Sequence, residues 1–121
     1  MIKRLDRLDV ATTDLNDAAS IYEKNFGFKV NRSGTDHASV TIGGAEIRLA
    51  SGAAVADAIK ANGEGMFGLW LEAEDIDRVI EAMKKAGLAT ASISKEGDRR
   101  ILALDPKLAN RVPLFIFDRK G

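Results

Sequence analysis

The chain contains the same order of residue patterns twice, and this repeat constrains its fold more than any other feature. Asp14-Leu15 recurs as Asp75-Ile76, an offset of 61 residues. Each pair follows a segment typical of a strand and begins a run of apolar residues at helical spacing that stops at a glycine. A repeat of this kind predicts two copies of one supersecondary unit. With 121 residues, we expect residues 1–121 to form a single domain built from two modules.

Module one, residues 1–50, is predicted to fold as βαβββ. Asp14 can accept hydrogen bonds from the first turn of a helix, and Gly27 suits the end of that helix. Gly43-Gly44 is typical of a tight hairpin between two strands. The predicted elements are a strand at 2–12, a helix from Leu15 to Phe26, and strands at 28–32, 37–42 and 45–50.

Module two, residues 66–121, repeats this plan after a connector at 51–65 that contains a short helix near 53–61. Asp75 is the expected helix cap and Gly87 the expected stop. Strands are predicted at 88–94, 99–104 and 111–118, with a turn at "DPKLAN" before the last. Pro113 cannot donate to a ladder, so its strand is predicted to lie at a sheet edge or to be bulged.

Composition excludes several classes of function. The chain has 18 Lys and Arg residues and 18 Asp and Glu residues, so its formal net charge is zero. We therefore expect no nucleic acid and no membrane partner. The chain has no cysteine, which excludes a disulfide framework, a thiolate metal site and a Cys nucleophile. No apolar run has the length of a membrane span or of a signal sequence, so we expect a cytoplasmic protein.

Three segments resemble those of a known family. They are "LDRLDVATTDLNDAASIYEKNFGFKV", "GLWLEAEDIDRVIEAMKKAG" and "DPKLANRVPLFIF". In this order they resemble the vicinal oxygen chelate superfamily, which contains glyoxalases, bleomycin resistance proteins and extradiol dioxygenases. The resemblance implies an α+β fold in which two βαβββ modules form a half-open, eight-stranded, barrel-like sheet with the site in its hollow. It also implies a homodimer. The "DPKLAN" turn departs from the family pattern by one extra residue and by Ala109 in place of glycine.

The resemblance also implies where a metal ion would bind, because metalloenzymes of the family take ligands from the first and last strands of each module. Those positions fall on Arg7, Arg48, Gly68 and Pro113 in this sequence. None carries a usual metal ligand, since arginine keeps its proton, glycine has no side chain and proline offers only its carbonyl. We therefore expect no metal ion and no cofactor.

A different metal site would have to use His37, the only histidine, together with Asp9, Glu46 or Glu72. A lone histidine is more often a surface or hydrogen-bonding residue than a ligand. The two arginines expected in the same hollow would also repel a cation. The sequence favours a hollow without a metal ion.

Strand alternation predicts which side chains line the hollow, because the alternate positions are mostly aliphatic and suit the side covered by helices. The expected ligand-binding residues are Arg7, Asp9, Glu46, Arg48, Trp70, Glu72, Phe115 and Phe117. Aromatic walls with a few polar groups are typical of a pocket for a small organic molecule. The alternative is that the charges form ion pairs and the aromatic rings fill the barrel or a dimer interface.

Three functions follow from this lining. The leading interpretation is a metal-free protein that binds a small organic ligand, in the manner of the bleomycin resistance branch. The second is a lyase, isomerase or dioxygenase-type enzyme with a non-standard metal set or with acid-base chemistry from Asp9, Glu46 or Glu72. The third is an accessory domain in which the pairing surface itself is the function.

Overall fold

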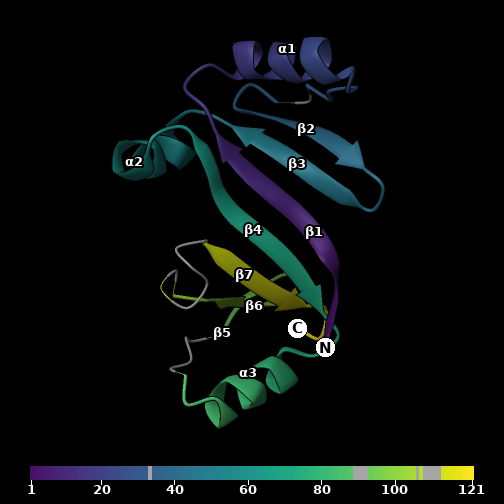
Figure 1. Ribbon diagram of the computed structural model, residues 1–121, viewed down its shortest axis with the longest axis vertical. Coiled ribbons are helices and arrows are strands. Elements are labelled where there is room, and N and C mark those ends of the chain that lie inside the picture. Colours follow the sequence, from purple (N-terminus) through teal and green to yellow (C-terminus); the bar gives the residue numbers. More distant parts are fainter. Residues whose placement is uncertain (33, 89–92, 106, 108–112) are drawn as a thin grey trace. The chain divides into compact units, whose positions relative to one another are not determined.

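The computed structural model describes residues 1–32, 34–88, 93–105, 107 and 113–121 (Figure 1). The elements of the first half are β1 (Ile2–Ala11), α1 (Leu15–Phe26), β2 (His37–Ile42), β3 (Ala45–Ala50) and α2 (Ala53–Asn62). Those of the second half are β4 (Gly65–Ala73), α3 (Ile76–Lys85), β5 (Ile93–Glu96), β6 (Arg99–Ala103) and β7 (Leu114–Asp118). This order confirms an α+β fold made of two related halves.

The described residues form two compact units. The N-terminal unit is Arg7–Phe67, and the C-terminal unit is Met1–Asp6 together with Gly68–Gly121. Strands β1 and β4 each contribute to both units, so the compact units differ from the module boundaries predicted from the repeat.

Both units have the same strand arrangement. The N-terminal unit has the order β2-β3-β1, with β1 parallel to β3 and β2 antiparallel to it. The C-terminal unit has the order β4-β7-β6-β5, with β4 parallel to β7 and the other pairs antiparallel. In each unit the first strand therefore lies parallel to the last, as a repeated module predicts.

The predicted caps determine where α1 and α3 begin. Asp14 Oδ1 accepts the Asp17 N–H at 3.0 Å, and Asp75 Oδ1 accepts the Asp77 N–H at 2.9 Å. Helix α1 ends at Gly27, whose φ of 68° suits a residue without a side chain. The two capping predictions are confirmed.

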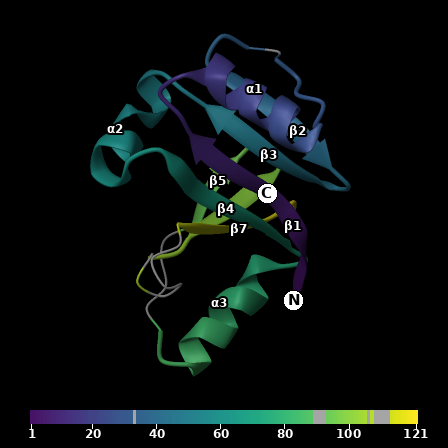
Figure 2. The same cartoon turned by 45° about the horizontal axis from the view of Figure 1, so that its top comes forward.

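Helices α1 and α3 each cover the aliphatic face of the sheet in their own unit. Helix α1 lies along β2 and β3 (Figures 1 and 2), where Ala19 packs in a buried region with Ala38, Val40 and Leu49. Helix α3 packs on β6 and β7 in the same way. Its core consists of Ala73, Ile76, Val79, Met83, Leu102 and Ile116. The opposite face of each sheet carries the polar and aromatic side chains.

Asp118 anchors α3 to the end of β7. Its side chain is 0% exposed, accepts the Ile76 N–H at 2.8 Å, and receives two hydrogen bonds from Arg100 at 2.6 and 3.1 Å. Burial alone would raise the pKa of Asp118, but the hydrogen bonds from Arg100, Ile76 and Lys120 outweigh it and lower the pKa below its usual value. The hydrogen bond to Asp118 likewise raises the pKa of Arg100. Asp118 thus stays charged within the core.

The predicted strand at 28–32 is reduced to a single bridge. Only Asn31 pairs with Ser39, through hydrogen bonds of 2.8 and 3.0 Å. Phe28 stacks on Phe26 with ring centroids 5.5 Å apart, and Arg32 bonds to side chains of α1, so this segment follows the helix and not the sheet. The described residues therefore form seven strands in place of the predicted eight.

Strands β5 and β7 of the C-terminal unit also differ from the prediction. Strand β5 spans Ile93–Glu96 in place of 88–94, of which 89–92 lie outside the described residues. Pro113 precedes β7, which lies between β4 and β6, so the prediction of an edge or bulged strand is wrong. Its carbonyl accepts the Leu69 N–H at 2.9 Å, and a proline just before a strand removes no ladder donor. Most of the "DPKLAN" turn, including Ala109, lies outside the described residues.

None of the helices in the described part of the chain has the length and apolar character that a bilayer crossing requires.

Candidate functional site

The polar face of the N-terminal unit brings together four of the predicted site residues. Arg7 lies opposite Glu46, and Asp9 opposite Arg48, in the parallel pair of β1 and β3. Residues directly opposite one another share a face of the sheet, so these four side chains stand on the face away from α1. The predicted alternation is confirmed for this unit.

The charges on this face neutralise one another. Arg7 Nε lies 2.9 Å from Asp9 Oδ1, with side chains 14% and 10% exposed. Arg48 Nε lies 3.1 Å from Glu46 Oε1, with side chains 41% and 31% exposed. Because each arginine has a carboxylate next to it on its strand and another across the ladder, this face has no excess of either sign.

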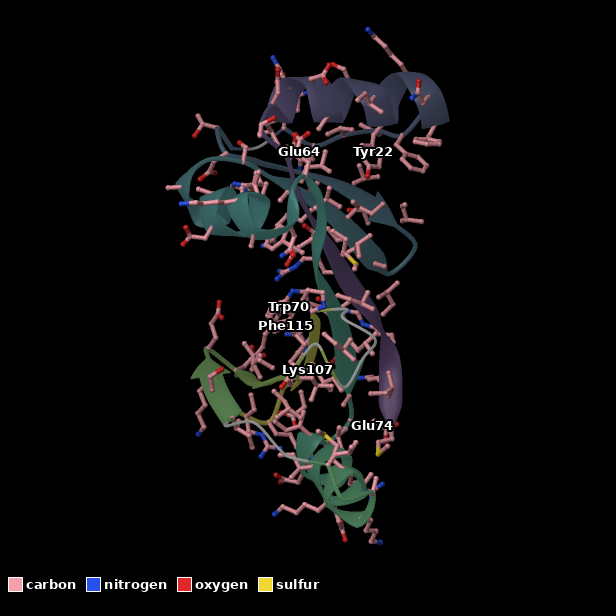
Figure 3. The ribbon with its side chains drawn as sticks, turned by 60° about the vertical axis from the view of Figure 1, so that its left-hand side comes forward. Tyr22, Glu64, Trp70, Glu74, Lys107 and Phe115 are labelled. Carbon is pink, nitrogen blue, oxygen red and sulfur yellow. The ribbon has the colours of Figure 1, made fainter. Side chains whose placement is uncertain are left out.

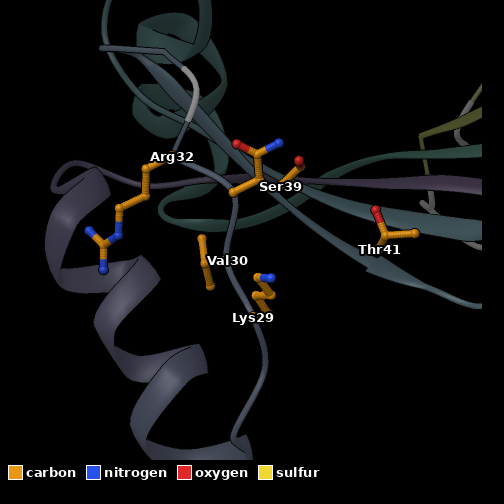
Figure 4. Close-up of a pocket in the computed structure, with 6 residues that line it drawn as sticks. Lys29, Val30, Arg32, Ser39 and Thr41 are labelled. Atoms are coloured by element: carbon orange, nitrogen blue, oxygen red, sulfur yellow. The ribbon is translucent and has the colours of Figure 1, made fainter.

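The pockets described on the N-terminal unit have mixed polar and apolar linings. One of about 470 Å³ lies beside β2 and is lined by Lys29, Val30, Asn31, Arg32, Ser39 and Thr41 (Figure 4). The Arg32 side chain points away from Ser39 and toward α1, where it bonds to Asn16 and Glu23. A second pocket of about 270 Å³ is lined in part by Arg48, His37 and Asp36. Of the predicted site residues, only Arg48 lines either pocket.

The corresponding face of the C-terminal unit carries aromatic side chains. Trp70 lies opposite Phe115 on β4 and β7, and their rings stack with centroids 4.5 Å apart at an angle of 14° (Figure 3). Phe117 meets Trp70 edge-on at 6.2 Å and 61° and is 0% exposed. Trp70 and Phe115 are only half-buried. We call Trp70, Phe115 and Phe117 the aromatic face.

Glu72 stands beside the aromatic face as a buried, paired carboxylate. It is 5% exposed and lies opposite Phe117 in the β4–β7 register. Arg4 Nε donates to Glu72 Oε1 at 2.9 Å, while Arg119 Nε lies 3.4 Å and Lys3 Nζ 3.9 Å from Glu72 Oε2. Three cations therefore surround one carboxylate.

Sequence reasoning missed Arg4, Arg99 and Arg119. Arg4 is four positions before Leu8 on β1 and therefore shares its face, so its sequence position suggested the side of the helix and not of the site. Arg99 Cζ lies 4.4 Å from the centroid of the Phe117 ring, and Arg119 Cζ lies 5.6 Å from it. Arg99 shares a strand face with Ile101, which lies opposite Phe117 in the β6–β7 register. Knowledge of that register would therefore have placed Arg99 on the aromatic face.

The residues present do not fit the divalent ion that the superfamily resemblance implies. Arg7 and Arg48 offer no lone pair, Gly68 has no side chain, and the Pro113 carbonyl already accepts the Leu69 N–H. His37 Nδ1 lies 3.0 Å from Asp36 Oδ1. Among the described residues, no group of three or more His, Cys, Asp or Glu side chains could hold a metal ion.

Several solved structures share this fold. A methylmalonyl-CoA epimerase in complex with methylmalonyl-CoA and NH4+ is 20% identical over 100% of this chain and 97% of its own, with a TM-score of 0.73. A hypothetical protein from Bacillus halodurans is 20% identical over 98% and 95%, with a TM-score of 0.74. Methylmalonyl-CoA epimerase from Mycobacterium tuberculosis is 18% identical over 99% and 90%, with a TM-score of 0.73. At these identities the likeness concerns the fold.

Comparison with curated proteins gives no match. The family model described as Glyoxalase/Bleomycin resistance protein/Dioxygenase superfamily matches residues 4–107, which is most of the sequence. The chain therefore belongs to the glyoxalase/bleomycin resistance protein/dioxygenase superfamily.

Proposed function

We propose that this protein binds a small organic ligand without a metal ion, and that the aromatic face of the C-terminal unit is its main binding wall. The observation that carries the proposal is the half-buried stack of Trp70 and Phe115, on the sheet face opposite α3. Flat aromatic side chains with a few polar groups beside them are the usual make-up of a small-molecule site.

A planar ligand would gain most from this wall. It could extend the stack of Trp70 and Phe115, and each aromatic pair adds about 0.5 to 1.5 kcal/mol beyond the area that it buries. Phe117 is fully buried, so its ring packs against Trp70 and is not itself exposed to a ligand. The ligand-binding roles predicted for Arg7, Asp9, Glu46 and Arg48 belong to the polar face of the N-terminal unit and remain predictions of their own.

Binding is favoured over acid-base chemistry because the candidate carboxylates are committed to cations. Asp9 is paired with Arg7, Glu46 with Arg48, and Glu72 with Arg4. A carboxylate oxygen that already accepts from a guanidinium has fewer lone pairs left to take a proton from a substrate. An enzyme of the same superfamily, such as an isomerase, is the alternative, since solved epimerases share the fold.

The proposal is tested by measuring metal content and ligand binding on the same preparation. Protein purified without chelator is expected to carry much less than one divalent ion per chain, and planar aromatic compounds are expected to raise its Tm. Phe115→Leu, which shortens the stack, should reduce that rise, while Phe28→Leu in the other unit should not. One tightly held ion per chain, or turnover of an acyl thioester that chelation abolishes, would contradict the proposal.

A further inference from the structure

We infer, on the basis of the proposed function, that the ligand of the aromatic face is a planar organic anion such as an aromatic carboxylate, and that Arg99 binds its negative charge. Nothing in the sequence pattern singled out Arg99 for this role. The inference depends on which charged groups surround the arginines of the polar face and those beside the aromatic face.

Arg99 lies against the aromatic face itself. Its Cζ is 4.4 Å from the centroid of Phe117, and the Phe117 ring meets Trp70 edge-on at 6.2 Å. A guanidinium held over a ring by its flat side keeps its N–H groups directed outward in the guanidinium plane. Those N–H groups match the two oxygens of a carboxylate.

Arg119 approaches the same ring but is already paired. Its Nε lies 3.4 Å from Glu72 Oε2, and its Nη1 lies 3.5 Å from Asp98 Oδ2. Among the described residues, no carboxylate forms an ion pair with Arg99, although Glu96 lies opposite it in the β5–β6 register. Of the two arginines over Phe117, Arg99 is therefore the one whose charge is available to a ligand.

Glu72 does not prevent an anion from binding here. Arg4 neutralises it through a hydrogen bond of 2.9 Å, and Lys3 and Arg119 add positive charge at 3.9 and 3.4 Å. Arg4 also pairs with Asp6 at 2.7 Å and Arg119 with Asp98 at 3.5 Å, so the charges around Glu72 offset one another. This leaves Arg99 as the cation that an anion beside the rings would meet. On the N-terminal unit, in contrast, Arg7 and Arg48 each have a carboxylate partner within 3.1 Å.

The experiment compares matched acids and amides: 1-naphthoate with 1-naphthamide, and indole-3-acetate with indole-3-acetamide. Trp70 is the only tryptophan, so its indole N–H gives a single NMR signal that reports directly on the aromatic face. In the wild-type protein each acid is expected to bind at least about tenfold more tightly than its amide. R99Q should abolish this preference, R99K should restore part of it, and R119Q should keep it.

The outcomes separate this inference from the proposed function. If acid and amide shift the Trp70 signal with the same Kd, or if R99Q keeps the preference for the acid, the inference is overturned and ligand binding stands. If R99Q and R119Q lose the preference for the acid equally, Arg99 is not the specific partner of the ligand's negative charge, and the inference is likewise overturned. If no compound of either kind shifts the signal, the proposed function is overturned as well.

Discussion

The two units share one strand arrangement but use their exposed sheet faces differently. The N-terminal unit sets two arginines against two carboxylates, and each guanidinium finds an acid on its own strand. The C-terminal unit stacks Trp70 on Phe115 and places arginines over Phe117. Paired charges satisfy one another within the protein, whereas half-buried rings still have apolar surface to cover. The comparison indicates that the shared backbone plan positions the two faces, and that the side chains make one face ionic and the other aromatic.

The largest expected difference concerns how each helix is anchored. Asp118→Asn should lower the free energy of unfolding by about 3 kcal/mol, because it leaves Arg100 beside a buried neutral amide. Asp14→Ala, which removes only the cap of α1, should cost about 1 kcal/mol. Denaturation in urea measures both changes. Equal losses in the two variants would show that the Asp118 network adds nothing beyond a cap.

The next difference lies within the N-terminal face. Asp9→Asn should cost about 1 to 2 kcal/mol of stability, since the Arg7–Asp9 pair is shielded from water. Glu46→Gln should cost less than about 0.5 kcal/mol, because its pair with Arg48 is exposed and screened. When urea denaturation is repeated at high salt, the stability loss of Glu46→Gln should shrink more than that of Asp9→Asn, because salt screens the exposed pair more strongly. A Glu46→Gln loss as large as that of Asp9→Asn would contradict this distinction.

A third comparison makes the same substitution in both units. Phe115→Leu should weaken binding of 1-naphthoate by about tenfold, because leucine cannot continue the stack. Phe28→Leu removes a ring from the cluster at the end of α1 and should leave the Kd unchanged. Calorimetric titration provides both values. A loss of affinity in Phe28→Leu alone would move the binding wall to the N-terminal unit.

The smallest expected effect is a dependence of stability on pH. The pKa of Asp118 is lowered in the folded protein, so its stabilising contribution is complete above the usual pKa of about 3.9 and is lost as pH falls through the folded value. The wild-type free energy of unfolding should therefore fall between about pH 5 and pH 2. In Asp118→Asn this fall should be shallower. Parallel pH profiles for the two proteins would rule out Asp118 as a source of the slope.

Much of the fold could be predicted from local chemistry. Capping aspartates, helix-ending glycines and strand alternation are signals carried by neighbouring residues, and α1, β2 and β3 begin and end where those signals indicate. The strand at 28–32 could not be predicted correctly, because its residues alternate like a strand but Phe28 stacks on the end of α1. Pro113 was misjudged for a related reason, since its effect depends on whether it lies inside β7 or just before it.

The site was predictable as a list of side chains but not as a set of partners. Alternation placed Arg7, Asp9, Trp70 and Phe115 on the sheet faces away from the helices, and the registers agree. Glu72 accepts a hydrogen bond from Arg4, whose sequence position suggested the opposite side of the strand. The predicted homodimer and the roles of the site residues in ligand binding remain predictions.

The most direct test of metal-free binding at the aromatic face follows the Trp70 indole N–H signal in protein treated with EDTA and then freed of chelator. Titration with 1-naphthoate is expected to give a saturable shift of this signal, with the same Kd before and after addition of Zn²⁺ or Mn²⁺. A signal that stays fixed in the metal-free protein and moves only once a divalent ion is added would contradict the account.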